Sequence, residues 1–278
     1  MNALTDPRPA EPEVTIDRQY GPWLAGRWVP APRFVLRRDR VLAAAEGLPP
    51  GKVLEFGCGS GALLHEFAQR GHECVGVETS AQARAIASDM LSAFPSAQIV
   101  GDLAEAGPFE ADLLIACEVL EHIEEDAAAL AQWVGRLRPG GRMILTVPAH
   151  MRMWGVRDVW AGHVRRYSRQ DLQRLADGIG LQVERIECNG FPLVNLTNFF
   201  ANLSVRGKGL AGGSEGQAQA TAASGVDRSL HLKLFGLQTS LPGRLILKAG
   251  CLLQRAFLGT DWGDCFVMVA TRRQALGW

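Results

Sequence analysis

The chain of 278 residues lacks any run of the ~18 uncharged apolar residues that a membrane-spanning helix needs. Residues 1–9 read MNALTDPRP and contain no apolar core, so we expect no signal peptide there. The six cysteines include no Cys-x-x-Cys pair, and several fall in or beside expected strands. We interpret them as small apolar residues of a protein in a reducing, cytoplasmic compartment.

The sequence also lacks an excess of charge of either sign, with 29 basic and 29 acidic residues. A nucleic-acid-binding domain is normally basic, so this balance argues against a nucleic-acid partner. Lysine is scarce, and arginine supplies 25 of the 29 basic residues, a skew that we attribute to codon bias. Hydrophobic residues make up 47% of the chain, which is enough for one substantial core and typical of a soluble enzyme.

The most informative segment is a short apolar run that ends in glycines. Residues 53–61 read VLEFGCGSG, and a helix-like segment follows over 62–68. The pattern predicts a buried strand that turns sharply into a helix, with so few side chains in the turn that a ligand can lie against the backbone. In an open α/β sheet such a turn lies at the carboxyl edge, where ligands bind.

Two classes of cofactor use a turn of this kind. The dinucleotide motif Gly-x-Gly-x-x-Gly matches Gly57 and Gly59 but has Ala62 in its third position, so this spacing alone is a weak signal. Glu55 distinguishes the two classes of cofactor better than the glycine spacing does. A carboxylate there would face the pyrophosphate of NAD with the wrong sign, whereas it suits a ligand that carries an ammonium and a sulfonium.

Acidic residues accompany four successive expected strands, at residues 53–56, 73–77, 97–100 and 111–117. The acids at or just after the strand ends are Glu55, Glu78, Asp102 and Glu118. Glu78 follows the first glycine by about twenty residues, where a carboxylate usually accepts hydrogen bonds from two ribose hydroxyls. A fifth strand is expected at 142–147, after a turn at 137–141, and a sixth at 181–187.

Taken together, these motifs resemble those of the class I S-adenosylmethionine-dependent methyltransferases, over residues from about 52 to 187. The matching segments are VLEFGCGSG at 53–61, VE at 77–78, GDL at 101–103, CEVLEH at 117–122 and RPGG at 138–141. The resemblance implies an α/β fold, with a Rossmann-like sheet of seven strands and helices on both faces. An antiparallel seventh strand at 264–271 would close that sheet.

The same resemblance implies S-adenosylmethionine as the cofactor and assigns residues to it. Glu55 and the backbone of Gly57 and Gly59 would hold the methionine end, and Glu78 the ribose. The remaining cofactor positions are Asp102 with Leu103 at the adenine edge, and Cys117 with Glu118 beside the sulfonium.

A loop after the fifth strand contains the candidate catalytic residues. It includes GHVRRYS at 162–168, and relatives that resemble this chain have a His followed by Arg-Arg-Tyr there. We expect His163 to act as general base or substrate hydrogen-bond partner, because its unperturbed pKa is near neutrality. Arg165 or Arg166 could bind an acidic group of the substrate, with Tyr167 as a wall of the site. Alternatively, His163 and Tyr167 only brace the loop.

The cluster EVLEH at 118–122 suggests a second chemistry. A helical turn would bring Glu118, Glu121 and His122 together. With His163 across the pocket, they would form a two-carboxylate, two-imidazole site suited to Mg²⁺, Mn²⁺ or Zn²⁺. Metal-free relatives carry the same residues, so our assignment includes no metal and keeps metal binding as the alternative.

The chain is expected to form one domain at 31–278, preceded by a loose arm at 1–30 that packs through Trp23 and Trp28. A mainly helical, lid-like insertion at 191–260 separates the sixth and seventh strands. It includes a helix at 191–205 and a flexible linker near 207–225. The insertion has seven basic and two acidic residues. It could cap the pocket, contact a membrane or lipid-linked substrate, or form a dimer interface.

The sequence therefore predicts a cytoplasmic methyltransferase, peripheral to the membrane if the insertion contacts lipid. It would methylate an oxygen, or in the alternative a nitrogen or carbon, of a small or lipid-linked acceptor. The alternatives are an NAD-dependent Rossmann oxidoreductase and a protein that binds S-adenosylmethionine without catalysis.

Overall fold

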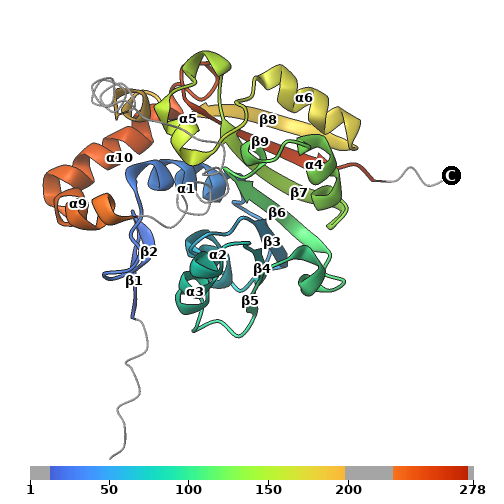
Figure 1. Cartoon of the computed structure of the whole chain (residues 1–278), viewed down its shortest axis with the longest axis horizontal. Helices are drawn as coiled ribbons and strands as arrows, with labels where there is room; N and C mark the ends of the chain where they lie inside the picture. The colour runs from blue at the N-terminus through green and yellow to red at the C-terminus, as the bar shows by residue number, and fades with distance from the viewer. Residues whose placement is uncertain (1–12, 198–227, 275–278) are drawn as a thin grey trace, which may run out of the picture.

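The computed structural model describes residues 13–197 and 228–274. Its centre is a seven-stranded sheet in the order β5-β4-β3-β6-β7-β9-β8 (Figure 1). Neighbouring strands from β5 to β7 are parallel, and β9 runs antiparallel to both β7 and β8. This confirms the expected Rossmann-like sheet. The strands are β3 Lys52–Phe56, β4 Glu73–Val77, β5 Ala97–Val100, β6 Ala111–Cys117, β7 Leu137–Pro148, β8 Leu181–Asn189 and β9 Cys265–Arg272.

Helices cover both faces of this sheet. On one face, Trp133 and Leu172 from α4 and α6 pack into a core with Phe56. On the other, α1, α2 and α3 form a second core through residues such as Leu64 and Ala87. The helices are α1 Pro32–Ala44, α2 Ala62–Ala68, α3 Ala81–Met90, α4 Asp126–Val134, α5 Val156–Ala161 and α6 Arg169–Gly178, with short 3-10 turns η1 Leu103–Ala106, η2 Leu120–His122 and η3 Met151–Met153.

Strand β3 shows why the glycine turn follows a buried segment. Successive residues of a strand point to opposite faces. Leu54 and Phe56 enter the core under α4 and α6, and Val53 enters the core under α1, α2 and α3. Because both faces are covered, the four residues after Lys52 are all buried. Glu55 shares the face of Val53, so a carboxyl group lies within the apolar layer beneath α1 and α2.

The described part of the N-terminal arm, residues 13–30, is packed rather than loose. It forms a hairpin of β1 Val14–Asp17 and β2 Gly21–Leu24. Leu24 and Trp28 are buried against residues of α2 and α3. Trp23 contacts Phe235 edge to face, with 5.2 Å between ring centroids. Trp23 and Trp28, through which the arm was expected to pack, therefore contact the domain in the described structure.

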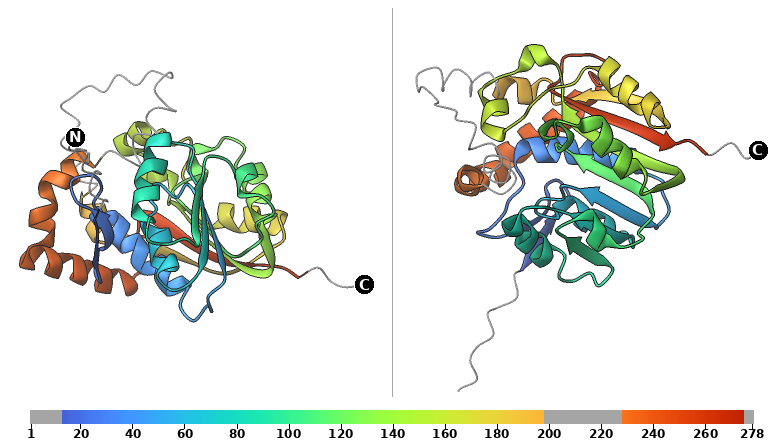
Figure 2. Two further views of the ribbon diagram at one scale, coloured as in Figure 1. Left: turned by 90° about the horizontal axis from the view of Figure 1, so that it is seen from below. Right: turned by 45° about the vertical axis from the view of Figure 1, so that its right-hand side comes forward.

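The region between β8 and β9 contributes two helices to the described structure, α9 Ser229–Thr239 and α10 Leu241–Arg255. They form a helical hairpin beside β1 and β2, and Leu247 of α10 packs against Leu36 of α1 (Figure 2). The expected linker at 207–225 and most of the expected helix at 191–205 lie outside the described residues. Within 13–197 and 228–274, no helix is long and apolar enough to cross a membrane.

Candidate active site

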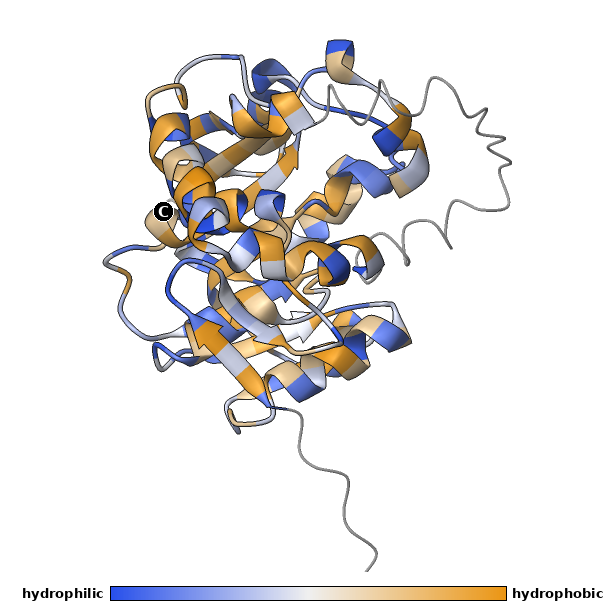
Figure 3. Cartoon of the chain, turned by 90° about the vertical axis from the view of Figure 1, so that its left-hand side faces the viewer, coloured by the Kyte–Doolittle hydropathy of each residue, from blue (hydrophilic) through white to orange (hydrophobic). Residues whose placement is uncertain are grey.

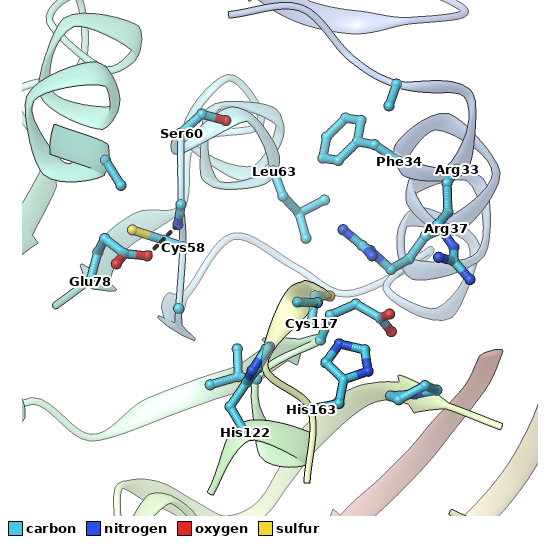
Figure 4. A pocket seen from close by; sticks show the side chains of 18 of the residues that line it. Arg33, Phe34, Arg37, Cys58, Ser60, Leu63, Glu78, Cys117, His122 and His163 are labelled. Carbon is cyan, nitrogen blue, oxygen red and sulfur yellow. Dashed lines mark hydrogen bonds between the residues drawn. The ribbon is translucent and has the colours of Figure 1, made fainter. Parts of the chain in front are cut away.

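A cavity of about 980 Å³ opens at the carboxyl ends of β3, β4 and β6. Its walls come from the glycine turn, the start of α1, the η2 turn and the α5 loop. Figure 4 shows Glu78 and Cys58 on one side of the cavity and Phe34 and Arg37 on the other. Seven of the residues expected in the site line it: Glu55, Gly57, Gly59, Glu78, Cys117, Glu118 and His163.

The glycine turn exposes its backbone to this cavity. Gly57 and Gly59 have φ angles of 63° and 55°, in the left-handed region that favours glycine. A Cβ atom at Gly57 would lie 2.4 Å from Cγ2 of Val119, so a side chain does not fit there. A Cβ atom at Gly59 would meet nothing within 4 Å, because this residue borders open space. A ligand can therefore approach the backbone closely at Gly59.

Glu78 lies across the glycine turn with its carboxylate fixed at both oxygens. Oε2 accepts a hydrogen bond from the backbone N–H of Gly59 at 3.0 Å, and Oε1 accepts one from Ser80 at 2.8 Å. Each carboxylate oxygen has a second lone pair. The side chain is only partly buried and borders the cavity, so it can accept two further hydrogen bonds from a ligand diol.

Glu55 lies deeper, at the base of the cavity. The residue is 3% exposed, and Oε2 has no hydrogen-bond partner within the described structure. Burial raises the pKa of this carboxyl well above its ordinary value, opposed by Arg37 and reinforced by Glu78. A buried acid without a partner favours a ligand that brings a positive charge to it.

Asp102 and Leu103 lie outside the residues that line this cavity. Asp102 is exposed, and its Oδ1 accepts a hydrogen bond from the N–H of Ala104 at 2.7 Å, which caps η1. Leu103 packs against the core under α4. Their assignment to an adenine edge stays a prediction.

His163 is oriented by a buried acid on the far side of the cavity. Its Nδ1 lies 2.8 Å from Oδ1 of Asp158, which also forms an ion pair with Arg166 at 2.7 Å. Burial would raise the pKa of Asp158, but the hydrogen bonds from His163 and Arg166 outweigh it and lower the pKa to about 2. An ionised Asp158 can accept a hydrogen bond from an N–H at Nδ1 of His163, and Nε2 of the same ring lies 3.7 Å from Oε1 of Glu121.

Tyr167 lies behind the cavity wall. It is 2% exposed, and its hydroxyl donates to Oδ2 of Asp126 at 2.9 Å. Arg165 also pairs with Asp126, and Arg166 is bound to Asp158. This placement favours the bracing alternative for Tyr167, and it leaves neither arginine free to bind a substrate acid.

The turn at 118–122 places two carboxyl groups in contrasting surroundings. Glu118 lines the cavity with a φ of 57°, and its Oε1 accepts hydrogen bonds from Thr146 and Cys265. Burial would raise the pKa of Glu118, but Arg37 and Arg33 lower it. Glu121 is fully buried, and burial together with the charge of Glu118 raises its pKa well above the ordinary value.

Glu121 is also the centre of the candidate metal site. Both of its oxygens lack a hydrogen-bond partner within the described residues, and Oε1 lies 3.7 Å from Nε2 of His163. One ligand atom each from Glu121, His122 and His163 falls within 4.8 Å of the others, and Glu118 is not part of this group. Burial and the neighbouring His163 lower the pKa of His122 to about 4, so its ring is neutral near pH 7. The donor set suits a divalent cation, and metal binding stays the alternative.

No motif in the sequence distinguishes the arginines of α1. Arg33 and Arg37 lie one helical turn apart and both line the cavity (Figure 4). Arg33 forms an ion pair with the buried Asp264. Arg37 has no hydrogen-bond or ion-pair partner among the described residues, so its guanidinium is available to a ligand. In a chain with 25 arginines, residue type alone does not distinguish these two from the others.

Comparison with known proteins places this geometry in a family. The family model described as a methyltransferase domain matches residues 31–186. The ubiquinone biosynthesis O-methyltransferase of Sodalis glossinidius is 30% identical over 138 residues, which cover 47% of this chain and 55% of that protein. The protein of the same name from Idiomarina loihiensis is 29% identical over 174 residues, covering 55% and 70% respectively. The chain thus spans about half to seven tenths of the length of these relatives.

Solved structures share the fold at low sequence identity. A methyltransferase structure from Bacillus halodurans has a TM-score of 0.55 at 14% identity, covering 85% of this chain and 99% of that one. Phosphoethanolamine N-methyltransferase 2 of Haemonchus contortus, solved with S-adenosyl-L-methionine, has a TM-score of 0.53 at 15% identity, covering 86% and 52%. The cyclase SpnF has a TM-score of 0.54 at 16% identity, covering 94% and 88%. Because the family model spans more than half of the chain, the protein belongs to the methyltransferase-domain family, with the class I Rossmann-like fold.

Proposed function

We propose that this protein is an S-adenosylmethionine-dependent methyltransferase that methylates a hydroxyl oxygen of a small or lipid-linked acceptor. The observation that carries the proposal is that one cavity joins two complementary halves. One half has the glycine turn with Glu55 and Glu78, and the other has His163 oriented by Asp158. The names of the curated relatives, which are O-methyltransferases, support oxygen as the acceptor atom.

The residues of the first half fit the chemical groups of S-adenosylmethionine. The unpartnered oxygen of Glu55 suits the ammonium of the methionine end, and the unpaired guanidinium of Arg37 suits its carboxylate. Glu78 has two oxygens in position for a ribose diol, and the open backbone at Gly59 allows close approach. When bound, S-adenosylmethionine supplies a methyl group activated by the sulfonium sulfur.

The second half provides for the acceptor. We assign His163 as the general base: Asp158 accepts a hydrogen bond from Nδ1, and Nε2, which lies 3.7 Å from Oε1 of Glu121, is the nitrogen left to take up a proton. An acceptor hydroxyl placed against Nε2 loses its proton to His163 while its oxygen bonds to the methyl carbon. Bound S-adenosylmethionine would supply the leaving group, because its carbon–sulfur bond would break as the new bond forms and leave the electron pair on sulfur. Asp158 then stabilises the positively charged imidazole.

The fold alone does not decide between methyl transfer and other reactions, as the similarity to a cyclase illustrates. An NAD-dependent oxidoreductase is disfavoured because Glu55 would lie beside a pyrophosphate. The His163–Asp158 pair supports an enzyme over a protein that only binds S-adenosylmethionine, because it places an oriented imidazole in the cavity.

Transfer of a labelled methyl group tests the proposal. The protein is incubated with cell extract and methyl-labelled S-adenosylmethionine, and the products are separated into lipid, polar metabolite, protein and RNA fractions. We expect label in the lipid or polar fraction, and its loss with the His163→Ala variant. Retained binding of S-adenosylhomocysteine without label in any fraction would refute catalysis. Calorimetric binding of NAD in its place would favour the oxidoreductase.

A further inference from the structure

The helical hairpin of α9 and α10 turns its apolar side to solvent. On α9, Leu230, Leu234 and Leu237 are 63%, 47% and 72% exposed and follow one another at helical spacing. On α10, Leu241 and Leu245 are 72% and 58% exposed, and the outward row continues through Ile246, Leu252 and Leu253. A surface helix normally confines its apolar residues to the buried side, whereas this hairpin packs Phe235 and Leu247 against the domain and also carries apolar residues on its outer side. Figure 3 shows the molecule from the side that carries these helices. We call this set of residues the outward face.

The inward side of the hairpin is fixed to the domain by specific contacts. The hydroxyl of Tyr20 donates to the backbone carbonyl of Gln238 at 2.6 Å. The buried side chain of Gln254 donates to the carbonyl of Leu36 and accepts from the N–H of Gly190, each at 3.2 Å. Because these contacts determine which side of the hairpin packs against the rest of the domain, they also determine that the outward face is exposed to solvent.

The charge of the hairpin favours one kind of partner. Residues 228–255 contain no aspartate or glutamate. Two of the basic residues are paired with the domain, Arg244 with Asp17 and Arg255 with Asp39. Lys233 and Lys248 are exposed and have no ion-pair partner within the described residues. Two copies of this surface would bring like charges together, whereas an anionic lipid surface complements both its leucines and its lysines.

The hairpin also adjoins the active-site cavity. Arg228 and His231, at the start of α9, line the cavity that contains His163. Trp160 of α5 lines the same cavity and is 48% exposed, and tryptophan is favoured at membrane–water interfaces. A lipid bound at the outward face would therefore lie next to the route into the site.

We propose that the outward face of α9 and α10 docks the protein on an anionic membrane surface, beside the cavity that receives a lipid-linked acceptor. The acceptor's head group enters the cavity while its tail stays in the bilayer. The docking surface follows from the exposed residues alone, and only the identity of the acceptor rests on the proposed function.

Vesicle flotation tests this docking. Full-length protein is mixed with vesicles of phosphatidylcholine, alone or with about 30% phosphatidylglycerol, without cofactor. We expect it to float with the anionic vesicles and to remain mostly unbound with the neutral ones. The Leu237→Glu/Leu241→Glu variant should reduce the bound fraction by about tenfold or more, because membrane binding scales with buried apolar area. Lys233→Glu/Lys248→Glu should remove the preference for anionic vesicles.

A matched control places the same charges on another helix. Ala128→Glu/Ala131→Glu adds two carboxylates to exposed positions of α4, on the opposite side of the molecule from the hairpin (Figure 1). This variant should float like the wild type. The docking proposal is overturned if the wild type ignores both kinds of vesicle, or if the control loses binding as fully as the leucine variant. It is also overturned if the Leu237→Glu/Leu241→Glu variant still binds vesicles but sediments as a monomer where the wild type sediments as a dimer.

A separate measurement keeps this test independent of the proposed enzyme activity. Calorimetric titration with S-adenosylhomocysteine, without vesicles, should give the same affinity for the leucine variant as for the wild type, which also shows that the variant is folded. Loss of flotation with intact nucleoside binding supports docking. Flotation of a protein that binds no S-adenosylhomocysteine would leave the docking inference standing and refute the proposed function.

Discussion

Replacing Glu78 by alanine should weaken binding of S-adenosylhomocysteine about 100-fold. Both oxygens of the carboxylate are already oriented by backbone N–H groups, at 3.0 Å from Gly59 and 2.8 Å from Ser80. A hydrogen bond to a charged group contributes roughly 1.5–3 kcal/mol. Because the side chain is only partly buried, we take the lower figure for each of two ribose hydroxyls. A loss of about 3 kcal/mol corresponds to about two orders of magnitude in Kd.

Isothermal titration calorimetry at fixed salt measures this change. Glu73→Ala is the matched control, because Glu73 is an exposed acid at the opposite end of the same strand. We expect the Glu73→Ala variant to bind S-adenosylhomocysteine with the affinity of the wild type. An analogue without the 2′-hydroxyl separates a direct contact from a displaced glycine turn. In the wild type this analogue should bind less tightly than S-adenosylhomocysteine, whereas in the Glu78→Ala variant the two ligands should bind with equal affinity. Unchanged affinity in a folded Glu78→Ala protein would refute the ribose assignment.

Three further substitutions test the remaining assignments. His163→Ala should lower kcat by about 100-fold or more while the Kd of S-adenosylhomocysteine stays within about threefold, since a general base typically contributes that much to the rate; the reverse pattern would make His163 structural. Arg37→Met should weaken the binding of S-adenosylhomocysteine about tenfold in calorimetry. The variant should bind methylthioadenosine, which has no carboxylate, with wild-type affinity, and an equal loss of affinity for both ligands would contradict a carboxylate contact. In metal-free protein, Glu121→Gln should raise Tm at pH 8 and change it little at pH 4. The reason is that burial and the charge of Glu118 raise the pKa of Glu121 in the folded protein above its ordinary value of 4.5. The protonated side chain therefore contributes its full free energy of stabilisation below pH 4.5, and this contribution is lost as the pH rises through the pKa of the folded state. A chelator that lowers the Tm of the wild type, with bound metal found by elemental analysis, would instead support the metal site.

The central strands of the sheet were predictable from the sequence because they are buried on both faces. Strands β3 and β6 are therefore mostly apolar, interrupted by Glu55 and Asp112, and the three alternating glycines mark the turn after β3. The start of β7 was not predictable in this way. Residues 137–141 were expected to form a turn, whereas β7 begins at Leu137, which pairs with Ala111 of β6. The next paired residue is Arg142, opposite Leu113, so RPGG at 138–141 forms an irregularity within the strand and keeps the turn-like character that its residues indicate.

The acids of the candidate site were predictable from their places in or just after strands, although Asp102 lies outside the cavity, and His163 was selected through the family resemblance. Glu55, Glu78 and Glu118 line the cavity because parallel strands end at one edge of the sheet. Tyr167 was expected in the site, but a bridge between Ala149 and Tyr167 turns its ring toward Asp126. Arg37 was missed because it reaches the cavity through the packing of α1 over the sheet. That packing depends on contacts between residues far apart in the sequence, and the residues next to Arg37 in the chain do not predict it.

A crystal structure with S-adenosylhomocysteine tests the central claim, that this cavity binds the methyl donor, most directly. The account predicts the ribose within hydrogen-bonding distance of Glu78, the backbone of Gly59 against the ligand, and the sulfur facing the side of the cavity that carries His163. A nucleoside bound elsewhere, or an empty cavity at saturating ligand, would contradict it.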